Sequence, residues 1–595
     1  MTRTEANRRR QPGDRDAEYL ALGGALTATL ILVTAVWVSA RLAGGDVADN
    51  PLTYLILLLT GRVAWPAGAT LVLLGITAVL TAVAVPAVRA VRARMKSRTF
   101  MINRASSLST AQDTAELREA GARADAHRLG CPHAGTGSPL GRHGRDNAPL
   151  WASYEWVQVW IMGPRAGKTT CVCVRQVLET TGPVVATSNK RDIVDKTRGP
   201  RSEQGAVWVF DPQGIIGEAP TWWFDPLALV TGIAEADELA ALFVASQRDA
   251  GAKTDAYFDN EGKALLATML LAAAAGQRPI TQVFTWLTDP DDAEPSKILA
   301  EAGHQIASDS LFAMSRLTPK QRDGVYGTAR AMVSFLRNEK VLPWVTTTGP
   351  DDKRPRFAPS TFVRSRQTIY LISREGRGTA RALTAALTVA IVTVAEEVAS
   401  HSPRGRLATP LTVVLDEAAN VCRWPELPDL YSHFGSRGIV ISTFLQSYAQ
   451  GVEVWGENGM RKLWSAANIR VVGSGLAEDR FLGELSHLIG ERDVVQRSSN
   501  RGKGGRSVSS SLHREPILSV GDLAKIPRGW GVMLSSGMPA TVLRLVHYGQ
   551  APYADKIEAS EVYYSSLLST AGATTSSIGN VSNRSVGVPE RGINT

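Results

Sequence analysis

Long uncharged runs mark the N-terminal part of the chain. Residues 19–40 and 63–88 contain no Asp, Glu, Lys or Arg, and each run can cross a hydrocarbon core of ~30 Å as a helix. Five basic residues precede the first run, five follow closely behind the second, and the loop between them holds two arginines. The positive-inside rule therefore predicts two transmembrane helices, at about 19–41 and 65–88, in a cell membrane with both termini cytoplasmic. A cleavable signal peptide is the alternative for the first run, but the second run and the missing small-residue cleavage site oppose it.

Beyond residue 150, short apolar runs alternate with helical patterns. A repeated order of strand, helix and strand predicts right-handed crossovers and an α/β fold with a mainly parallel sheet. From residue 234 to 342 the apolar spacing is helical instead, which indicates an all-α insertion. The predicted strands cover residues 157–161, 182–188, 207–210, 368–372, 411–417 and 438–447, with later ones at 469–472 and 531–534.

These patterns divide the chain into an N-terminal transmembrane domain, a polar linker, an α/β domain interrupted by the insertion, and a polar tail. We predict that residues 497–511, which are rich in Ser, Gly and Arg, form a mobile loop, and that the tail is disordered. The transmembrane domain covers residues 1–98 and the linker 99–150. The α/β domain covers 151–233 and 343–550, the insertion 234–342 and the tail 551–595.

Composition changes this picture little. The 595 residues, 44% hydrophobic and 20% charged, are ordinary globular material for more than one core. The formal net charge of +9 comes partly from arginines beside the predicted spans, which suit anionic lipid, so charge alone does not indicate nucleic acid. The four cysteines form no disulfide framework, which suits a reducing cytosolic body. Cys131 and His133 lack the two further ligands that a zinc site needs at fixed spacing.

The main chemical motif follows the strand at residues 157–161. Met162 leads into Gly163-Pro164-Arg165-Ala166-Gly167-Lys168-Thr169-Thr170 and then an apolar helix. Backbone N–H groups of such a turn can hold phosphate oxygens, Lys168 can reach the β and γ phosphates, and the Thr169 hydroxyl can bind Mg²⁺. Met162 stands where the pattern G-x-x-x-x-G-K-[ST] has its first glycine. We predict a site for ATP and Mg²⁺ at these residues, with a chance Gly-Lys-Thr sequence as the alternative.

Two later strands end in polar residues that fit the same chemistry. Asp416 and Glu417 follow an apolar run; in P-loop enzymes the first acid at such a strand end holds Mg²⁺, and the second acts as general base toward the attacking water. Gln446 ends the next strand, and we predict that it senses the γ-phosphate. The alternative for Asp416 and Glu417 is an apolar strand that leaves the core at a charged loop. The alternative for Gln446 is a strand that ends in a solvated amide.

Together these motifs resemble the TraG/TraD-like coupling proteins of type IV secretion and conjugation, in the forms with two N-terminal membrane helices, as far as about residue 550. The resemblance implies a RecA-like P-loop ATPase domain and an all-α domain that meets the DNA-processing complex, in a homo-hexamer. The motifs are the phosphate loop, Ser188-Asn189-Lys190-Arg191-Asp192, Phe210-Asp211-Pro212, Phe224-Asp225-Pro226-Leu227, Tyr257-Phe258-Asp259, Leu415-Asp416-Glu417-Ala418-Ala419-Asn420, Ser436-Arg437-Gly438-Ile439 and Gln446-Ser447.

One family motif is incomplete. The stretch Gly-Arg-Ser-Arg-Gly reads Phe434-Gly435-Ser436-Arg437-Gly438 here, so one of its arginines remains. A transferring phosphoryl group needs a cation beyond the P-loop lysine and Mg²⁺, and in ring motors a neighbouring subunit often supplies it. Arg437 precedes the strand that carries Gln446 and is our candidate for this finger; a surface arginine without a role is the alternative.

The resemblance implies ATP-driven delivery of single-stranded DNA, with its attached relaxase, to a type IV secretion (conjugation) channel at the membrane. An FtsK-type double-stranded DNA pump is the first alternative, opposed by the helical insertion and by the absence of an obvious C-terminal winged-helix pattern. An ATPase that couples effector proteins is the second. A non-hydrolysing nucleotide-binding membrane scaffold is the third, and it has no need of a general base such as Glu417.

Overall fold

The computed structural model describes residues 30–247, 255–374, 380–502 and 505–579. The chain forms two compact units, residues 1–99 and 100–595. In the first unit, helices cover Leu30–Leu42, Pro51–Leu59 (α2) and the start of Ala69–Ala105 (α3), whose last turns belong to the second unit.

Membrane crossing stays a prediction. The apolar helical stretches Leu30–Leu42 and Ala69–Ala82 are shorter than a typical spanning helix, and residues 19–29 of the first predicted span lie outside the described residues. In the part of the chain that the structure describes, only Arg381–Ser400 (α15) is long and apolar enough to span a bilayer. Because 72% of its apolar window is buried within the protein, α15 is a core helix of the second unit.

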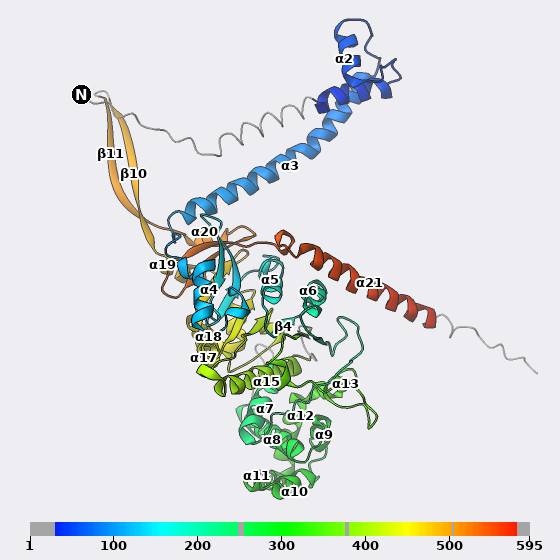
Figure 1. Cartoon of the computed structure of the whole chain (residues 1–595), viewed down its shortest axis with the longest axis vertical. Helices are drawn as coiled ribbons and strands as arrows, with labels where there is room; N and C mark the ends of the chain where they lie inside the picture. Colours follow the sequence, from blue (N-terminus) through cyan, green and yellow to red (C-terminus); the bar gives the residue numbers. More distant parts are fainter. Residues whose placement is uncertain (1–29, 248–254, 375–379, 503–504, 580–595) are drawn as a thin grey trace, which may run out of the picture. The chain divides into compact units, whose positions relative to one another are not determined.

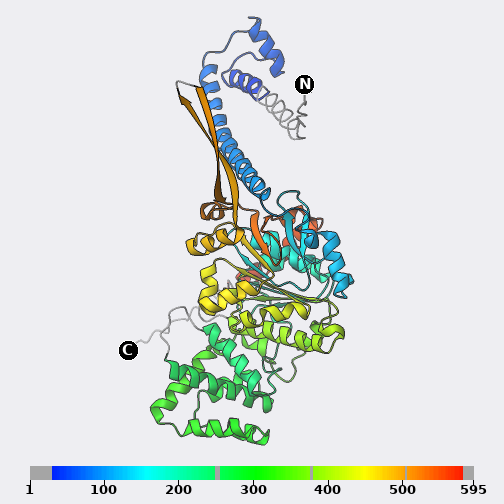
Figure 2. The same cartoon turned by 90° about the vertical axis from the view of Figure 1, so that its left-hand side faces the viewer.

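An eleven-stranded sheet organises the second unit (Figures 1 and 2), in the order β2-β1-β13-β12-β9-β3-β8-β7-β4-β6-β5. From β9 to β5 every neighbouring pair is parallel, whereas β12, β13, β1 and β2 extend the sheet with antiparallel pairs. The predicted mainly parallel α/β sheet is confirmed. The strands are Ser138–His143 (β1), Pro149–Ala152 (β2), Gln158–Ile161 (β3), Val184–Ser188 (β4), Val207–Phe210 (β5), Thr368–Ile372 (β6), Leu411–Leu415 (β7), Ile439–Leu445 (β8), Ile469–Gly473 (β9), Trp530–Ser535 (β12) and Thr541–Arg544 (β13).

Helices cover both faces of this sheet, so the parallel strands are buried on both sides. Alternate residues of β3 show the division: Val159 and Ile161 belong to one apolar cluster and Trp160 to the other. The helices outside the insertion are Glu119–Arg128 (α4), Val174–Leu178 (α5), Asp192–Ser202 (α6), Leu342–Val345 (α13), Pro359–Phe362 (α14), α15, Ala418–Val421 (α16), Leu427–Ser436 (α17), Tyr448–Ala466 (α18), Asp479–Ile489 (α19), Val520–Ala524 (α20) and Ala554–Gly579 (α21).

Residues 99–150 are not a linker, contrary to our prediction. They supply α4, β1 and β2, and β1 pairs antiparallel with β13 through Arg142↔Arg544 and His143↔Leu543. Leu140 is fully buried by this pairing. The strands are short and contain Gly, Pro and His, so they carry no alternating pattern that the sequence could reveal.

The segment predicted as an insertion is helical. Between β5 and α13 the chain forms Ile233–Gln247 (α7), Ala256–Ala275 (α8), Ile280–Trp286 (α9), Glu294–Glu301 (α10), Gln305–Ser315 (α11) and Pro319–Met332 (α12). Leu265, Leu266 and Leu270 of α8 are buried at the helical spacing that the sequence shows. Phe210 at the end of β5 packs edge-on against Trp344 of α13, with ring centroids 5.4 Å apart, so the helix that follows the insertion packs against the strand that precedes it.

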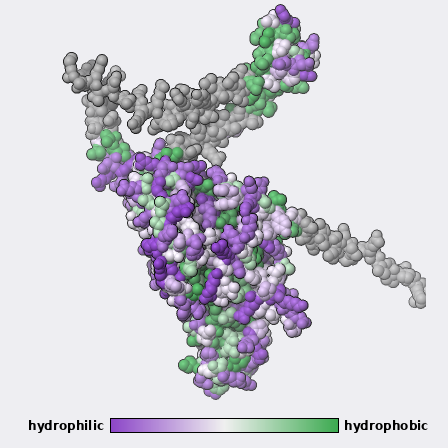
Figure 3. All heavy atoms as spheres, in the orientation of Figure 1, coloured by the Kyte–Doolittle hydropathy of each residue, from purple (hydrophilic) through white to green (hydrophobic). Residues whose placement is uncertain are grey.

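The surface of the second unit in Figure 3 is largely hydrophilic, with apolar side chains more frequent toward the inserted helices. On α11, Ile306 is 88% exposed and Phe312 is 55% exposed. Scattered exposed apolar residues are ordinary on a protein surface.

Two further predictions were wrong. Residues 497–511 are not an irregular loop, because Glu491–Gly502 (β10) and Gly505–Pro516 (β11) pair in register as a long antiparallel hairpin (Figure 1). The tail is helical as far as residue 579: α21 lies along α6, with Ile557 buried and the Ser560 hydroxyl donating to the Asp195 carbonyl oxygen at 2.5 Å. Both segments are polar, so their order comes from pairing partners that composition does not reveal. Residues 580–595 lie outside the described residues.

Candidate functional site

The phosphate loop joins β3 to a helical segment at the carboxyl edge of the parallel strands. Gly167 has a φ of +96°, which side-chain-bearing residues rarely adopt, and Arg165 is held at a φ of 59°. The helical segment begins as a wide π-type turn, Thr169–Cys173, and continues as α5. The backbone around Gly167 therefore takes a conformation that only glycine adopts without strain.

The neighbouring strand β9 explains the departure at Met162. The Met162 side chain is fully buried and packs over Gly473, where an added Cβ would lie 2.6 Å from its Cγ. Gly163 lies so close to Gly475 that a Cβ on it would overlap the Gly475 carbonyl oxygen, and its N–H donates to the Ser474 carbonyl oxygen at 2.9 Å. The loop therefore keeps its close backbone approach one residue later than the usual pattern.

Two pairs of side chains link the phosphate loop to the end of β7. Lys168 Nζ donates to Glu417 Oε1 at 3.0 Å, and Thr169 Oγ1 donates to Asp416 Oδ2 at 2.8 Å. Glu417 has a left-handed backbone with φ 56°, a strained conformation for a residue with a side chain. The predicted lysine, threonine and two acids are thus in direct contact.

Asp416 is suited to a divalent cation. It is buried, and burial raises the pKa of its carboxyl group to about 6 although the nearby Lys168 opposes the shift. Its Oδ1 atom has no hydrogen-bond partner among the described residues, while Oδ2 receives the Thr169 hydroxyl. A buried carboxylate oxygen without a partner, beside a threonine hydroxyl, matches the oxygen ligands that Mg²⁺ prefers. Thr187 of β4 fixes the strand end by donating to the Asp416 carbonyl oxygen at 3.0 Å.

Gln446 joins the same network from the end of β8. Its Nε2 donates to Glu417 Oε2 at 2.7 Å, so the two Glu417 oxygens are shared between Lys168 and Gln446. Gln450 was not among the predicted site residues; its Oε1 accepts the Gln446 backbone N–H at 2.9 Å. The spacing Ser-x-x-Gln at the start of α18 is a helix-capping signal that could have identified it.

The remaining predicted residues lie in two places, the phosphate loop and the amino end of β8. Pro164, Arg165, Ala166 and Thr170 belong to the loop and its first helical turn; Ala166 N–H donates to the Gly163 carbonyl oxygen at 3.3 Å, and the Thr170 hydroxyl to the Gly167 carbonyl oxygen at 3.5 Å.

Arg437 lies elsewhere. It precedes β8, at the opposite edge of the sheet from Gln446, and its guanidinium donates to the Gly405 carbonyl oxygen at 3.2 Å. The seven residues of β8 span ~23 Å at 3.3 Å per residue. Because an arginine side chain is far shorter than that, Arg437 does not reach the Lys168 site of its own chain.

A protein-family model described as the TraM recognition site of TraD and TraG matches residues 410–528, which include Asp416, Glu417 and Gln446. Residues 410–528 of the chain are therefore TraG/TraD-like. No curated protein sequence gives a significant match to the chain.

The fold of this chain is similar to that of one solved coupling protein. The bacterial conjugative coupling protein TrwBdeltaN70 in its unbound monoclinic form matches with a TM-score of 0.50 and 16% sequence identity, over 71% of this chain and 91% of that one. A structure of the plasmid coupling protein TrwB in complex with ADP and Mg²⁺ matches with a TM-score of 0.48 and 15% identity, over 71% and 92%. At 16% identity, the likeness to TrwBdeltaN70 concerns the fold alone.

Proposed function

We propose that this TraG/TraD-like chain binds ATP with Mg²⁺ at residues 163–170 and Asp416 and hydrolyses it to drive the transfer of a substrate. The observation that carries the proposal is the contact of Lys168, Thr169, Asp416, Glu417 and Gln446 at one edge of the sheet. The Lys-Thr pair suits phosphates and Mg²⁺, and the strand-end acids suit Mg²⁺ and an attacking water. A nucleotide-binding scaffold needs no acid like Glu417.

The ion pair between Lys168 and Glu417 defines a resting arrangement. Lys168 has further N–H donors for phosphate oxygens, and Glu417 becomes a stronger proton acceptor when Lys168 moves from it to those oxygens. Gln446 still holds the second Glu417 oxygen after that exchange, so it keeps the carboxylate oriented. When Mg²⁺ is bound by Thr169 and Asp416, it supplies charge neutralisation for the phosphate oxygens.

We propose further that the substrate is single-stranded DNA with its relaxase, and that the receiver is a type IV secretion channel. In this proposal the chain is anchored in the cell membrane by spans at about 19–41 and 65–88 with both termini cytoplasmic, and it works as a homo-hexamer in which Arg437 acts on a neighbour's site. The TraG/TraD-like family model and the two uncharged N-terminal runs support this assignment. Because Arg437 lies far from its own site, any action it has on hydrolysis would be in trans.

DNA-stimulated ATP hydrolysis by the full-length chain in detergent or nanodiscs tests the proposal. We expect turnover that rises with single-stranded DNA more than with double-stranded DNA, and that is absent in Lys168→Ala. Stimulation by double-stranded DNA alone would favour an FtsK-type pump. Turnover that is unchanged by either form of DNA but rises with a secreted protein would favour effector coupling. Nucleotide binding without any turnover would favour a scaffold.

A further inference from the structure

The position of Gln446 depends on the first turn of α18, which begins immediately after Ser447. The Ser447 hydroxyl accepts the Gln450 N–H at 3.1 Å and so caps the helix, while the Gln450 side chain accepts the Gln446 N–H at 2.9 Å. Gln446 in turn donates to Glu417 at 2.7 Å. Any shift of this helical turn would therefore move the Gln446 amide relative to Glu417.

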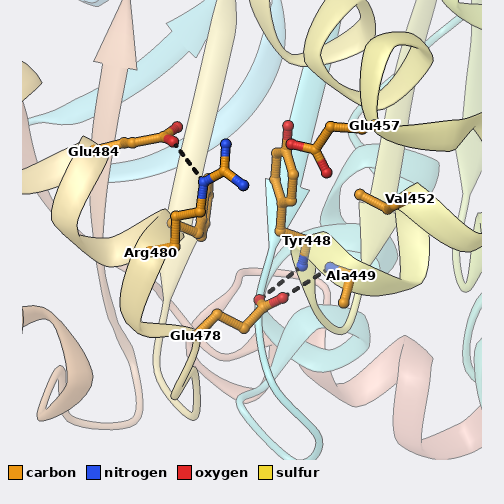
Figure 4. A pocket seen from close by; sticks show the side chains of 8 residues that line it. Tyr448, Ala449, Val452, Glu457, Glu478, Arg480 and Glu484 are labelled. Atoms are coloured by element: carbon orange, nitrogen blue, oxygen red, sulfur yellow. Dashed lines mark hydrogen bonds and ion pairs between the residues drawn. The ribbon is translucent and has the colours of Figure 1, made fainter.

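A second element holds the same turn. Glu478, from the segment between β9 and α19, accepts the N–H of Tyr448 at Oε2 and the N–H of Ala449 at Oε1, both at 2.8 Å (Figure 4). The first N–H groups of a helix have no partner within the helix and lie at the positive end of its dipole, so a carboxylate there is stabilising. Glu478 thus fixes the start of α18 from outside that helix.

The segment that carries Glu478 also touches the phosphate loop. Its first residue, Ser474, accepts the Gly163 N–H at 2.9 Å, and Gly475 packs directly against Gly163 without room for a Cβ. Residues 474–478 therefore contact the phosphate loop at one end and the helix that follows Gln446 at the other. A displacement of either side is transmitted through a few residues of backbone.

We propose that Glu478 is a positioning residue that holds Gln446 against Glu417 and keeps both in register with the phosphate loop. This role rests on the ATP hydrolysis proposed above. Glu478 touches neither the phosphate loop side chains nor Glu417, so it acts through α18. Its loss should slow turnover, because Gln446 no longer orients Glu417, and it should leave nucleotide affinity unchanged, because residues 163–170 bind the phosphates.

The same region supplies a matched control. Glu478 lines a cavity of about 200 Å³ together with Tyr448, Phe481 and Glu484, where the Tyr448 and Phe481 rings stack at 4.8 Å between centroids. Glu484 is exposed and pairs with Arg480 at 3.4 Å (Figure 4). Glu484→Gln makes the same chemical change in the same cavity without touching the start of α18.

The experiment compares Glu478→Gln, Glu478→Asp and Glu484→Gln in the full-length chain, with kcat from ATP hydrolysis, Kd from a fluorescent ADP analogue with Mg²⁺, and the melting temperature. We expect kcat of Glu478→Gln to fall ~10-fold per binding-competent chain while Kd stays within about twofold. Glu478→Asp keeps the charge with a shorter reach, and we expect an intermediate kcat. Glu484→Gln should match the unaltered chain in both constants.

A double-mutant cycle separates positioning from mere helix stabilisation. If Glu478 acts through Gln446, adding Glu478→Gln to Gln446→Ala should lower kcat no further. A further ~10-fold loss in the double variant, or an unchanged kcat in Glu478→Gln alone, would overturn the positioning role while leaving the ATPase proposal intact. Absence of turnover in the unaltered chain would overturn the ATPase proposal, and this role with it.

Discussion

The polar residues at the two ends of strand β8 make very different contacts. At its carboxyl end Gln446 contacts Glu417, which contacts Lys168, so residues from three strand ends form one network. At its amino end Arg437 donates to a backbone carbonyl of Gly405. Parallel strands bring all their carboxyl ends to one edge, and the motifs after β3, β7 and β8 therefore meet there. A polar residue next to a parallel strand in the sequence therefore reaches the phosphate site only if it lies at the carboxyl end of that strand.

The largest effect should come from the carboxyl edge. We expect Glu417→Gln to lower turnover by ~10²- to 10⁴-fold with ATP affinity near that of the unaltered chain, because an amide cannot accept the proton of the attacking water. Steady-state hydrolysis and nucleotide titration of the full-length chain check this. Glu397→Gln, on the exposed side of α15, serves as the control. Turnover within twofold of the unaltered chain would remove Glu417 from the site.

Variants of Arg437 test whether the amino edge of the sheet also takes part in hydrolysis. If Arg437 acts on a neighbouring subunit, Arg437→Ala should bind ATP but scarcely hydrolyse it. An equal mixture with Lys168→Ala should then recover up to about a quarter of the unaltered activity, because about that share of interfaces pairs an intact Lys168 with an intact neighbouring Arg437.

Crosslinking must confirm that the two variants enter the same assemblies. If mixed assemblies form and no mixing ratio restores activity, the amino edge has no catalytic role.

Backbone contact at the carboxyl edge can be tested at Gly163. We expect Gly163→Ala to cost ~3 kcal/mol of stability or nucleotide binding, since its Cβ would overlap the Gly475 carbonyl oxygen. Gly483→Ala is the matched control, because no atom lies within 4 Å of a Cβ added there. Thermal unfolding and ADP titration measure both variants, and equal behaviour of the two would show that the loops are not tightly packed.

The smallest expected effect concerns the charge on Asp416. Its pKa in the folded chain is about 6, above the ordinary ~3.9, so the folded state holds this proton more tightly than the unfolded state. Without nucleotide, stability should therefore fall as pH rises from about 4 to 6. Asp416→Asn should be more stable than the unaltered chain at pH 7, by at most ~3 kcal/mol, and nearly equal to it near pH 4. The same difference at both pH values would contradict this account.

The sequence by itself determined the parallel part of the sheet and most of the phosphate site. Continuous apolar runs predicted β3, β4, β5, β6, β7 and β8, because strands buried on both faces leave that local pattern. Gly167, Lys168 and Thr169 could be named because their motif follows such a run, and Asp416, Glu417 and Gln446 because they stand at the end of one. Their convergence follows from the parallel arrangement.

Only the tertiary structure decided the rest, because the deciding contacts join distant segments. Gly473 and Gly475 accommodate Met162 and Gly163, and nothing near the phosphate loop in the sequence announces this. The pairing of β1 with β13, the hairpin β10–β11 and the packing of α21 on α6 order polar segments that carry no apolar pattern of their own. In the sequence nothing distinguishes Glu478 from the other acidic residues, whereas in the fold its carboxylate accepts two N–H groups of α18. Local patterns record how a segment is buried, whereas such partners are chosen by the whole chain.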